Sequence, residues 1–457
     1  MLLKKILLPT LIGLSFSLSS FAYSENSLRQ SIDDYIYTEN NLKNAVIGLK
    51  IRDLKTNQDI YSLNSSKLFT PASNTKVLTS LIALEKLGKD YKFKTILSSD
   101  AKISNKTLNG DLYFIFKGDP TFKHQDIDYL FSKLKENGIE KIEGNIIIDK
   151  SYFDDILYGS GWMWDDMDSC DSSPISPIVI DNNCVNAKII LDNSNISIDS
   201  KNINTFNVKD LKKAEKEDIK TKFENNVLNI SGEIKESTDI EQSIIKPELY
   251  LESYLKNNIL NEFDFKGKII FNSNKDENIS KNILAFKESE PLSKILKFFN
   301  EESHNLTGEI LTKTVGTIDS IPSSTKKGIN VLNKYLKEKF KYNDFRVVDG
   351  SGLSRYNLFS PDLMVDVLTY LYQNDEYRDV VLEAFPLGAK EGTLKNRLKD
   401  MKKFKVIAKS GSMTGVNCLS GYLINNSQVY VFSIMINNSN LSGKELRDIQ
   451  DKILYMI

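Results

Sequence analysis

Two residues near the start of the chain have types and a spacing that suit acyl-transfer chemistry. Ser73 and Lys76 lie one helical turn apart, directly after Pro71 and at the start of an apolar pattern that predicts a helix over about 74–87. A hydroxyl at the start of a helix lies at the positive end of the helix dipole, and a lysine one turn later can reach back to it. The pair therefore predicts a serine nucleophile with a lysine base. The alternative is a plain N-cap serine, because Ser-x-x-Lys recurs elsewhere in this chain.

Two further motifs follow much later in the chain. The first reads Asp-Gly-Ser-Gly-Leu-Ser-Arg-Tyr-Asn over 349–357 and places Ser354 and Asn357 in a glycine-rich loop. The second is a strand-like run that ends in Lys409-Ser410-Gly411. Neither motif is informative alone, but the order of all three is.

In this order the motifs resemble the signature of the serine penicillin-binding proteins and serine β-lactamases, which is Ser-x-x-Lys, then Ser-x-Asn, then Lys-[Ser/Thr]-Gly. The chain is most similar to the D-alanyl-D-alanine carboxypeptidase/endopeptidase family of low-molecular-mass penicillin-binding proteins, the type 4 group. The long interval between Ser73 and Ser354 fits that family, which carries a large insertion there. The similarity also covers 118–121, 161–166, 392–397 and 409–422.

The resemblance implies an α/β (α+β) fold: a penicillin-binding/β-lactamase-like transpeptidase domain, with an antiparallel sheet flanked by helices and inserted β-rich domains. It implies a secreted serine DD-peptidase that acts on peptidoglycan peptides through an acyl-enzyme. The bonds cleaved would be D-Ala-D-Ala termini, D-Ala-diaminopimelate cross-links, or both. β-Lactam antibiotics would be covalent inhibitors, and no cofactor or metal is expected.

The resemblance also assigns roles. Ser73 would attack the carbonyl, a neutral Lys76 would take the proton, and Ser354 would relay it to the leaving amine. Burial and the nearby cation Lys409 would keep Lys76 neutral. The N–H groups of Ser73 and Ser412 would form the oxyanion hole. Trp164 and Asp166 would contact the diaminopimelate side chain. The full set of expected substrate-binding residues is Asn357, Lys409, Ser410, Gly411, Ser412, Trp164 and Asp166.

The chain departs from the family pattern at two positions. Ser410 stands where threonine is commoner, which keeps the hydroxyl. Tyr356 occupies the strict Ser-x-Asn position, so Asn357 comes one residue late and its amide role is open. For the segment with Trp164 and Asp166, local packing is the alternative.

The same scaffold is compatible with other functions. A β-lactamase or esterase is one alternative, but the Glu-x-x-Leu-Asn segment with which class A β-lactamases deacylate is absent from the sequence. A non-catalytic peptidoglycan-binding scaffold is another, and the intact Ser73, Lys76, Ser354 and Lys409 argue against it.

The elements that must position these residues come from both ends of the chain. We predict one discontinuous catalytic domain, built from 23–90 and 286–457, because strand-like and helical patterns occur in both parts. The strand-like runs cover 45–52, 59–61, 419–424 and 429–436, and the helical patterns cover 292–300, 361–373 and 444–456. The region 91–285 reads as a β-rich insertion of two subdomains, without βαβ units.

The first 22 residues have the pattern of a signal peptide, with Lys4 and Lys5 before an apolar core and Ala22 at a cleavage site. We expect export to the periplasm and no integral membrane segment after cleavage; the alternative is a retained anchor. Export permits a disulfide, and Cys170 and Cys184 could pair, whereas Cys418 reads as a small buried residue.

Composition excludes some functions. The 457 residues carry 60 Lys+Arg against 61 Asp+Glu, so no basic surplus exists for a nucleic-acid partner. With only two histidines, a Ser-His-Asp triad and a histidine-rich metal site are disfavoured. Composition leaves open whether the chain forms a homo-oligomer.

Overall fold

The computed structural model describes residues 27–39, 42–193, 195–200, 203, 205–273 and 282–457, so the predicted signal peptide lies outside the described residues. The chain forms two compact units. Unit 1 comprises the chain up to Asn74 together with Leu358–Arg378 and Phe385–Ile457, and unit 2 comprises Thr75–Asn357 and Asp379–Ala384. The predicted division into a catalytic domain and an insertion over 91–285 remains a prediction.

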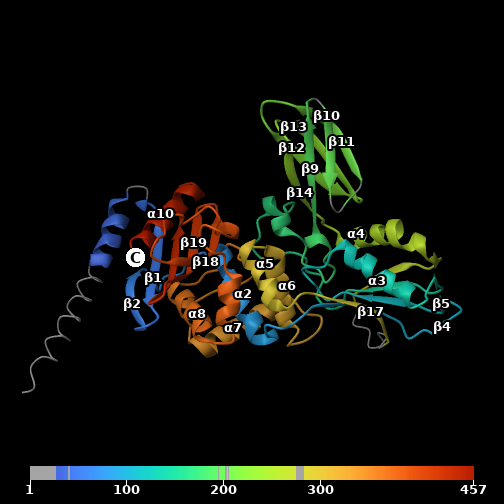
Figure 1. Cartoon of the computed structure of the whole chain (residues 1–457), viewed down its shortest axis with the longest axis horizontal. Coiled ribbons are helices and arrows are strands. Elements are labelled where there is room, and N and C mark those ends of the chain that lie inside the picture. The colour runs from blue at the N-terminus through green and yellow to red at the C-terminus, as the bar shows by residue number, and fades with distance from the viewer. Residues whose placement is uncertain (1–26, 40–41, 194, 201–202, 204, 274–281) are drawn as a thin grey trace, which may run out of the picture. The chain divides into compact units, whose positions relative to one another are not determined.

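Unit 1 is built on a five-stranded sheet with the order β18-β19-β20-β1-β2, in which every neighbouring pair is antiparallel. Helices flank this sheet (Figure 1), as predicted. Its elements are a helix over 27–38, β1 (Val46–Asp53), β2 (Gln58–Leu63), the 3₁₀ turn η2 (Ala72–Asn74), α8 (Pro361–Gln373), η8 (Gly392–Leu394), β18 (Lys405–Met413), β19 (Val416–Ile424), β20 (Val429–Asn437) and α10 (Gly443–Tyr455).

The two faces of the sheet are distinguished by the alternation of side chains along β1. Ile47, Leu49 and Ile51 join a buried apolar cluster that includes the inward face of α10. The residues between them face α8, where Lys50 Nζ lies 2.8 Å from Asp362 and Arg52 Nη1 lies 2.7 Å from Asp366. Alternation with a period of two thus places one helix on each face.

Unit 2 begins with a group of helices. The helix α2 (Thr75–Leu87) packs against α5 (Leu292–Glu301), α6 (Asn305–Gly316) and α7 (Thr325–Phe340). All twelve residues of α6 are buried, including polar and charged ones. A helix that is enclosed on every side has no solvent-facing stripe, so α6 escaped the sequence-based prediction.

The rest of unit 2 is rich in strands, as predicted. It contains sheets of order β16-β8-β6-β3-β17, β15-β7-β5-β4, β10-β9-β14 and β11-β13-β12. The strands are β3 (Lys94–Ser98), β4 (Ile103–Ser104), β5 (Thr107–Leu108), β6 (Leu112–Ile115), β7 (Lys141–Ile142), β8 (Ile146–Asp149), β9 (Cys184–Asp192), β10 (Asn195–Ser200), β11 (Phe206–Lys213), β12 (Asp218–Glu224), β13 (Val227–Ile234), β14 (Thr238–Ser243), β15 (Asp264–Phe265), β16 (Ile269–Asn272) and β17 (Ile283–Glu288). Short helices complete it: α3 (His124–Glu136), α4 (Pro247–Tyr254) and α9 (Arg378–Ala384).

One expectation about this region was wrong. The strand β6 continues through α3 into β8, and β6 pairs with β8 in parallel, which is a βαβ unit. The inward face of α3 carries Ile127, Leu130, Phe131 and Leu134, a helical spacing that the sequence displays.

The cysteines behave as predicted. Cys170 and Cys184 form a disulfide with a Cα–Cα distance of 5.5 Å, and Cys418 is fully buried. The carboxylate of Glu241 lies close to the two joined sulfurs, but a disulfide offers no thiolate to a metal ion. Within the described ranges, no helix combines the length and the apolar character needed to cross a membrane.

Candidate active site

Ser73 lies in η2, a short turn that unit 1 holds against its sheet. The side chain of Asn74 is fully buried and donates to Ser420 Oγ on β19 at 2.7 Å. Strand β18 approaches η2 so closely that a Cβ on Gly411 would lie 2.7 Å from Pro71 O and 2.9 Å from Ser73 N. Gly411 therefore permits the backbone of Lys409-Ser410-Gly411 to lie beside the backbone of the candidate nucleophile.

The other predicted residues of β18 lie beside Gly411. Lys409 is fully buried, and its Nζ donates to Ser410 O at 2.8 Å. Ser410 Oγ donates to Thr393 Oγ1 at 2.7 Å, and Ser412 is exposed. Since β18 is the outer strand of its sheet, unit 1 presents Ser73 and Lys-Ser-Gly at one sheet edge.

In unit 2, Lys76 is a lysine without solvent exposure. Its Nζ donates to Asn305 Oδ1 and to Ser351 O, both at 2.7 Å. Burial lowers the pKa of Lys76 to about 7, although Asp349, Glu309 and Asp171 act in the opposite direction. At a pH near 7, an amine with this pKa has about half of its molecules in the basic, neutral form.

Asn305 is a residue that the sequence reasoning missed. It closes the triplet Ser303-His304-Asn305, which matches Ser-x-Asn strictly, whereas 354–357 does not. His304 is the N-cap of α6, and its Nδ1 accepts from Thr307 N. Burial and the neighbouring Lys76 lower the pKa of His304 to about 4, so its ring is neutral. Strict Ser-x-Asn spacing also occurs at 62–64, 200–202 and 280–282, so the sequence alone does not single out this triplet; the contact between Asn305 and Lys76 does.

The loop over 349–357 is organised around one carboxylate. Asp349 Oδ1 accepts from Gly352 N at 2.9 Å and from Asn357 Nδ2 at 2.6 Å. Its Oδ2 accepts from Ser354 N at 2.6 Å and from Trp162 Nε1 at 3.1 Å. Asp349 thus links the loop to the segment around Trp162.

Ser354 and Asn357 are both engaged inside this loop. Ser354 is fully buried, its Oγ accepts from Tyr356 N at 3.2 Å, and a Cβ on Gly161 would lie 2.7 Å from that Oγ. Asn357 donates to Ser354 O at 3.1 Å as well as to Asp349, and its Oδ1 accepts from Val348 N at 2.8 Å. Both amide N–H groups of Asn357 therefore bond within the loop.

The predicted substrate-reading residues lie on the short turn η3 (Trp164–Asp166). The side chain of Trp164 is 85% exposed, which argues against the alternative of local packing for this residue. Asp166 is half-buried, and its backbone closes the turn. Their role toward diaminopimelate remains a prediction.

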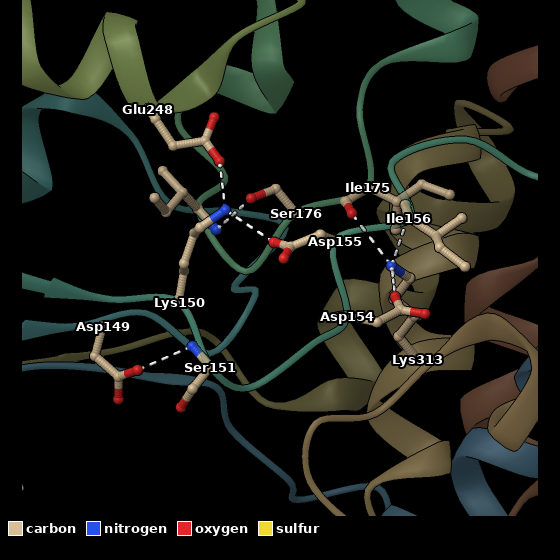
Figure 2. A network of polar contacts seen from close by, with 11 residues as sticks. Asp149, Lys150, Ser151, Asp154, Asp155, Ile156, Ile175, Ser176, Glu248 and Lys313 are labelled. Carbon is tan, nitrogen blue, oxygen red and sulfur yellow. Dashed lines mark hydrogen bonds and ion pairs between the residues drawn. The ribbon is translucent and has the colours of Figure 1, made fainter. Parts of the chain in front are cut away.

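Two lysines bond the segment 154–156, which precedes this turn in the sequence (Figure 2). Lys313 of α6, fully buried, donates to Asp154 Oδ1 and Ile156 O, both at 2.7 Å, and burial lowers its pKa. Lys150 bonds Asp155 at 2.9 Å and Glu248 at 3.1 Å. The buried helix α6 thus contacts both Lys76 and the segment that leads to Trp164.

The motifs and the fold together define a class. Serine penicillin-binding proteins and β-lactamases are characterised by three motifs, all of which this chain has. They are Ser-x-x-Lys at a helix start, a strict Ser-x-Asn whose amide oxygen contacts the buried lysine, and Lys-Ser-Gly on the outer strand of an antiparallel sheet. Within that class, the model of the D-Ala-D-Ala carboxypeptidase 3 (S13) family matches residues 28–456, and the chain belongs to this family. The predicted family and class of enzyme are confirmed.

Relatives agree with this assignment. The D-alanyl-D-alanine carboxypeptidase DacB of Haemophilus influenzae is 28% identical over 435 residues, covering 91% of this chain and 88% of the relative. A crystal structure of penicillin binding protein 4 from the same organism has a TM-score of 0.81 at 27% identity and covers 93% of this chain and 97% of that one. A second structure of that protein, complexed with a novel β-lactam, has a TM-score of 0.75 at 24% identity with the same coverage.

The close approach of Gly411 to η2 predicts the outcome of one substitution. Gly411→Ala should displace η2 and lower the rate of acylation by a penicillin about 100-fold, because a shift of about 1 Å at a reacting group has an effect of this size. Gly388→Ala is the matched control: it lies beside the same strand, and its Cβ would meet neighbours at an ordinary 3.4 Å. Equal acylation by both variants would contradict the proposed role of Gly411.

Proposed function

We propose that this chain is an exported serine DD-peptidase of the cell envelope, located in the periplasm, that cleaves D-Ala-D-Ala termini and D-Ala-diaminopimelate cross-links of peptidoglycan. The observation that carries the proposal is Lys76: a wholly buried lysine with a pKa of about 7, in contact with the Asn of a Ser-x-Asn motif and one turn after Ser73. Membership of the D-Ala-D-Ala carboxypeptidase 3 family supports the substrate class.

The proposed reaction has two halves. Ser73 Oγ attacks the carbonyl carbon of the penultimate D-alanine while neutral Lys76 takes its proton. The oxyanion that forms is stabilised by the N–H groups of Ser73 and Ser412, each worth about 3 kcal/mol in comparable sites. The C–N bond then breaks, the leaving amine receives a proton, and the acyl group stays on Ser73 as an ester. Water hydrolyses this ester and restores the serine.

For the proton relay to the leaving amine, we propose Ser303 in preference to Ser354. Ser303 stands two residues before Asn305, whose Oδ1 contacts Lys76 Nζ. Ser354 Oγ accepts a backbone N–H and lies against Gly161. In this proposal Ser354 and Asn357 position the loop, and the catalytic role predicted for Ser354 becomes the alternative that an experiment must separate.

Substrate binding is assigned to the remaining predicted residues. Lys409 and the hydroxyl of Ser410 would hold the terminal carboxylate of the peptide, since a lysine and a hydroxyl offer charge-assisted hydrogen bonds to carboxylate oxygens. Exposed Trp164 would contact the peptide stem, and Asp166 would pair with the amino group of diaminopimelate. β-Lactams would acylate Ser73 in place of the peptide.

Replacement of the nucleophile tests the whole proposal. Ser73→Ala should abolish labelling by a fluorescent penicillin and lower the release of D-alanine at least about 1,000-fold, because loss of a nucleophile has effects of this order. Ser132→Ala, the serine of another Ser-x-x-Lys in the chain, is the control and should retain both activities.

The products of a cross-linked muropeptide dimer separate the activities. Free D-alanine indicates carboxypeptidase action, and monomers indicate endopeptidase action. Labelling of Ser73→Ala would overturn the proposal, and rapid turnover of bound penicillin would favour a β-lactamase.

The pKa of Lys76 makes the acylation rate pH-dependent. Since only the neutral amine accepts the proton, the rate should rise with pH to a plateau through a midpoint near 7, and reach about a tenth of the plateau at pH 6. Stopped-flow acylation between pH 5.5 and 9 measures this. Lys76→Arg, which stays charged throughout this range, should lose the plateau. Near-normal acylation of Lys76→Ala at neutral pH would exclude Lys76 as the base.

The two candidate relays can be compared directly. Ser303→Ala should lower acylation by about 100-fold or more, the usual size of a lost proton transfer, whereas Ser354→Ala should change it by less than about 10-fold. Each variant removes one hydroxyl, and thermal melting verifies that both are folded. The reverse ranking would return the relay to Ser354.

A further inference from the structure

Glu309 is a buried carboxylate for which the proposed mechanism has no role. It lies on α6, one turn after Asn305, and none of its surface is exposed. Its Oε1 accepts from Gly350 N at 3.0 Å and from Ser351 N at 2.8 Å. Its Oε2 has no hydrogen-bond partner among the described residues. Burial of a carboxylate costs free energy unless hydrogen bonds compensate for the lost water, so the contacts of Glu309 indicate its role.

The backbone that Glu309 binds is the same backbone that holds Lys76. The peptide groups of Gly350 and Ser351 point their N–H groups to α6 and their carbonyls to α2. Gly350 O accepts from Thr79 Oγ1 at 2.6 Å, and Ser351 O accepts from Lys76 Nζ at 2.7 Å. These two residues therefore form a bridge between the helices, with Glu309 at one end and the candidate base at the other.

The bridge has no room to shift sideways. A Cβ on Gly350 would lie 1.9 Å from Thr312 Oγ1 and 2.4 Å from Gly308 O, and one on Gly308 would lie 3.0 Å from Gly350 O. Glycines at both positions let the backbone lie directly on α6. The two bonds from Glu309 fix the peptide planes on either side of Gly350. The Ser351 carbonyl lies in the next plane, whose N–H group, that of Gly352, donates to Asp349 Oδ1 at 2.9 Å, so Glu309 and Asp349 hold this carbonyl from its two sides.

From these contacts we propose that Glu309 is a positioning residue for Lys76: it fixes the backbone of Gly350 and Ser351, from which the Ser351 carbonyl reaches Lys76 Nζ, and it places a carboxylate near the candidate base. The inference rests on the proposed function, in which Lys76 is the base. A carboxylate in this place acts on Lys76 in two separable ways, through the geometry of the bridge and through its charge.

The charge contribution must be weighed against the other groups around Lys76. Asp349 from the loop and Asp171 from the turn η4 (Cys170–Ser172) also raise the pKa of Lys76. His304, at the start of α6, faces Lys76 with a neutral ring, because burial and the Lys76 charge lower its own pKa to about 4. Lys313, further along α6, faces Glu309. Burial raises the pKa of Glu309 to about 7, so Glu309 and Lys76 titrate over the same pH range.

Three variants separate geometry from charge. Glu309→Gln keeps an acceptor for both amides and removes the charge. The ammonium form of Lys76 then loses a stabilising neighbour, so the midpoint of the acylation profile should fall by about one pH unit, with the plateau within about 3-fold of wild type. Glu309→Leu removes the acceptor too and should lower the plateau at least about 30-fold. Thr79→Val loosens the same bridge at Gly350 without touching charge and should leave the midpoint in place.

Acylation of the full chain by a fluorescent penicillin between pH 5.5 and 9 is the measurement, with thermal melting to confirm folding. An unmoved midpoint in Glu309→Gln, or a normal plateau in folded Glu309→Leu, would overturn the inference. If Glu309→Leu does not fold, the midpoint of Glu309→Gln decides alone. Failure of wild type to be labelled at Ser73 would instead overturn the proposed function, so the two failures are distinguishable.

Discussion

In unit 2, the helices α2 and α6 and the 350–351 backbone meet at one buried amine, that of Lys76. A lysine cut off from water is stable only if its protons find acceptors or if it gives one up, and Lys76 does both: Asn305 and Ser351 accept from it, and its pKa falls to about 7. Each acceptor in turn has to be fixed. Asn305 is fixed at the first turn of a helix, and Ser351 is fixed by Glu309. The polar contacts around α6 can therefore be understood as the support of the buried Lys76 amine, the proposed base.

The helix α6 serves this requirement because it is enclosed on every side. Asn305, Glu309 and Lys313 are four residues apart in turn and therefore share one stripe of the helix. Along that stripe they bond Lys76, the 350–351 backbone and the 154–156 segment respectively. Buried charges are usually a liability, and here each is bonded to a backbone segment that carries part of the candidate site. One rigid helix thereby sets the positions of three segments that are distant in sequence.

Amphipathic helices and strands could be predicted from the sequence because one face packs on the core and the other faces solvent. Apolar and polar residues therefore recur along the sequence with the period of the helix or strand. Strands β1, β19 and β20 and helices α5, α8 and α10 were placed within a few residues, since each packs one face on a core. The helix α6 was missed for the opposite reason: it has no exposed face, so its Thr, Glu and Lys residues are buried together with its Leu, Ile and Val residues and do not mark a solvent-facing side. Asn305 and Glu309 were missed with it, because their importance comes from contacts with residues that are remote in sequence, which no local pattern records.

The choice between the two serine motifs shows how spacing encodes a role. In the loop, Asn357 follows Ser354 by three residues, and that separation lets its amide close a turn on Ser354 O while Asp349 receives the remaining donors. In Ser303-His304-Asn305 the separation is two, His304 caps the helix, and the amide of Asn305 projects from the first residue of α6 to the lysine. The aspartate, glycines and asparagine of the loop thus form a turn whose polar groups are hydrogen-bonded within the loop itself. A difference of one residue separates an asparagine that completes a loop from one that bonds Lys76. Since strict Ser-x-Asn spacing also occurs at 62–64, 200–202 and 280–282, the contact with the buried lysine assigns the role, and the spacing only permits it.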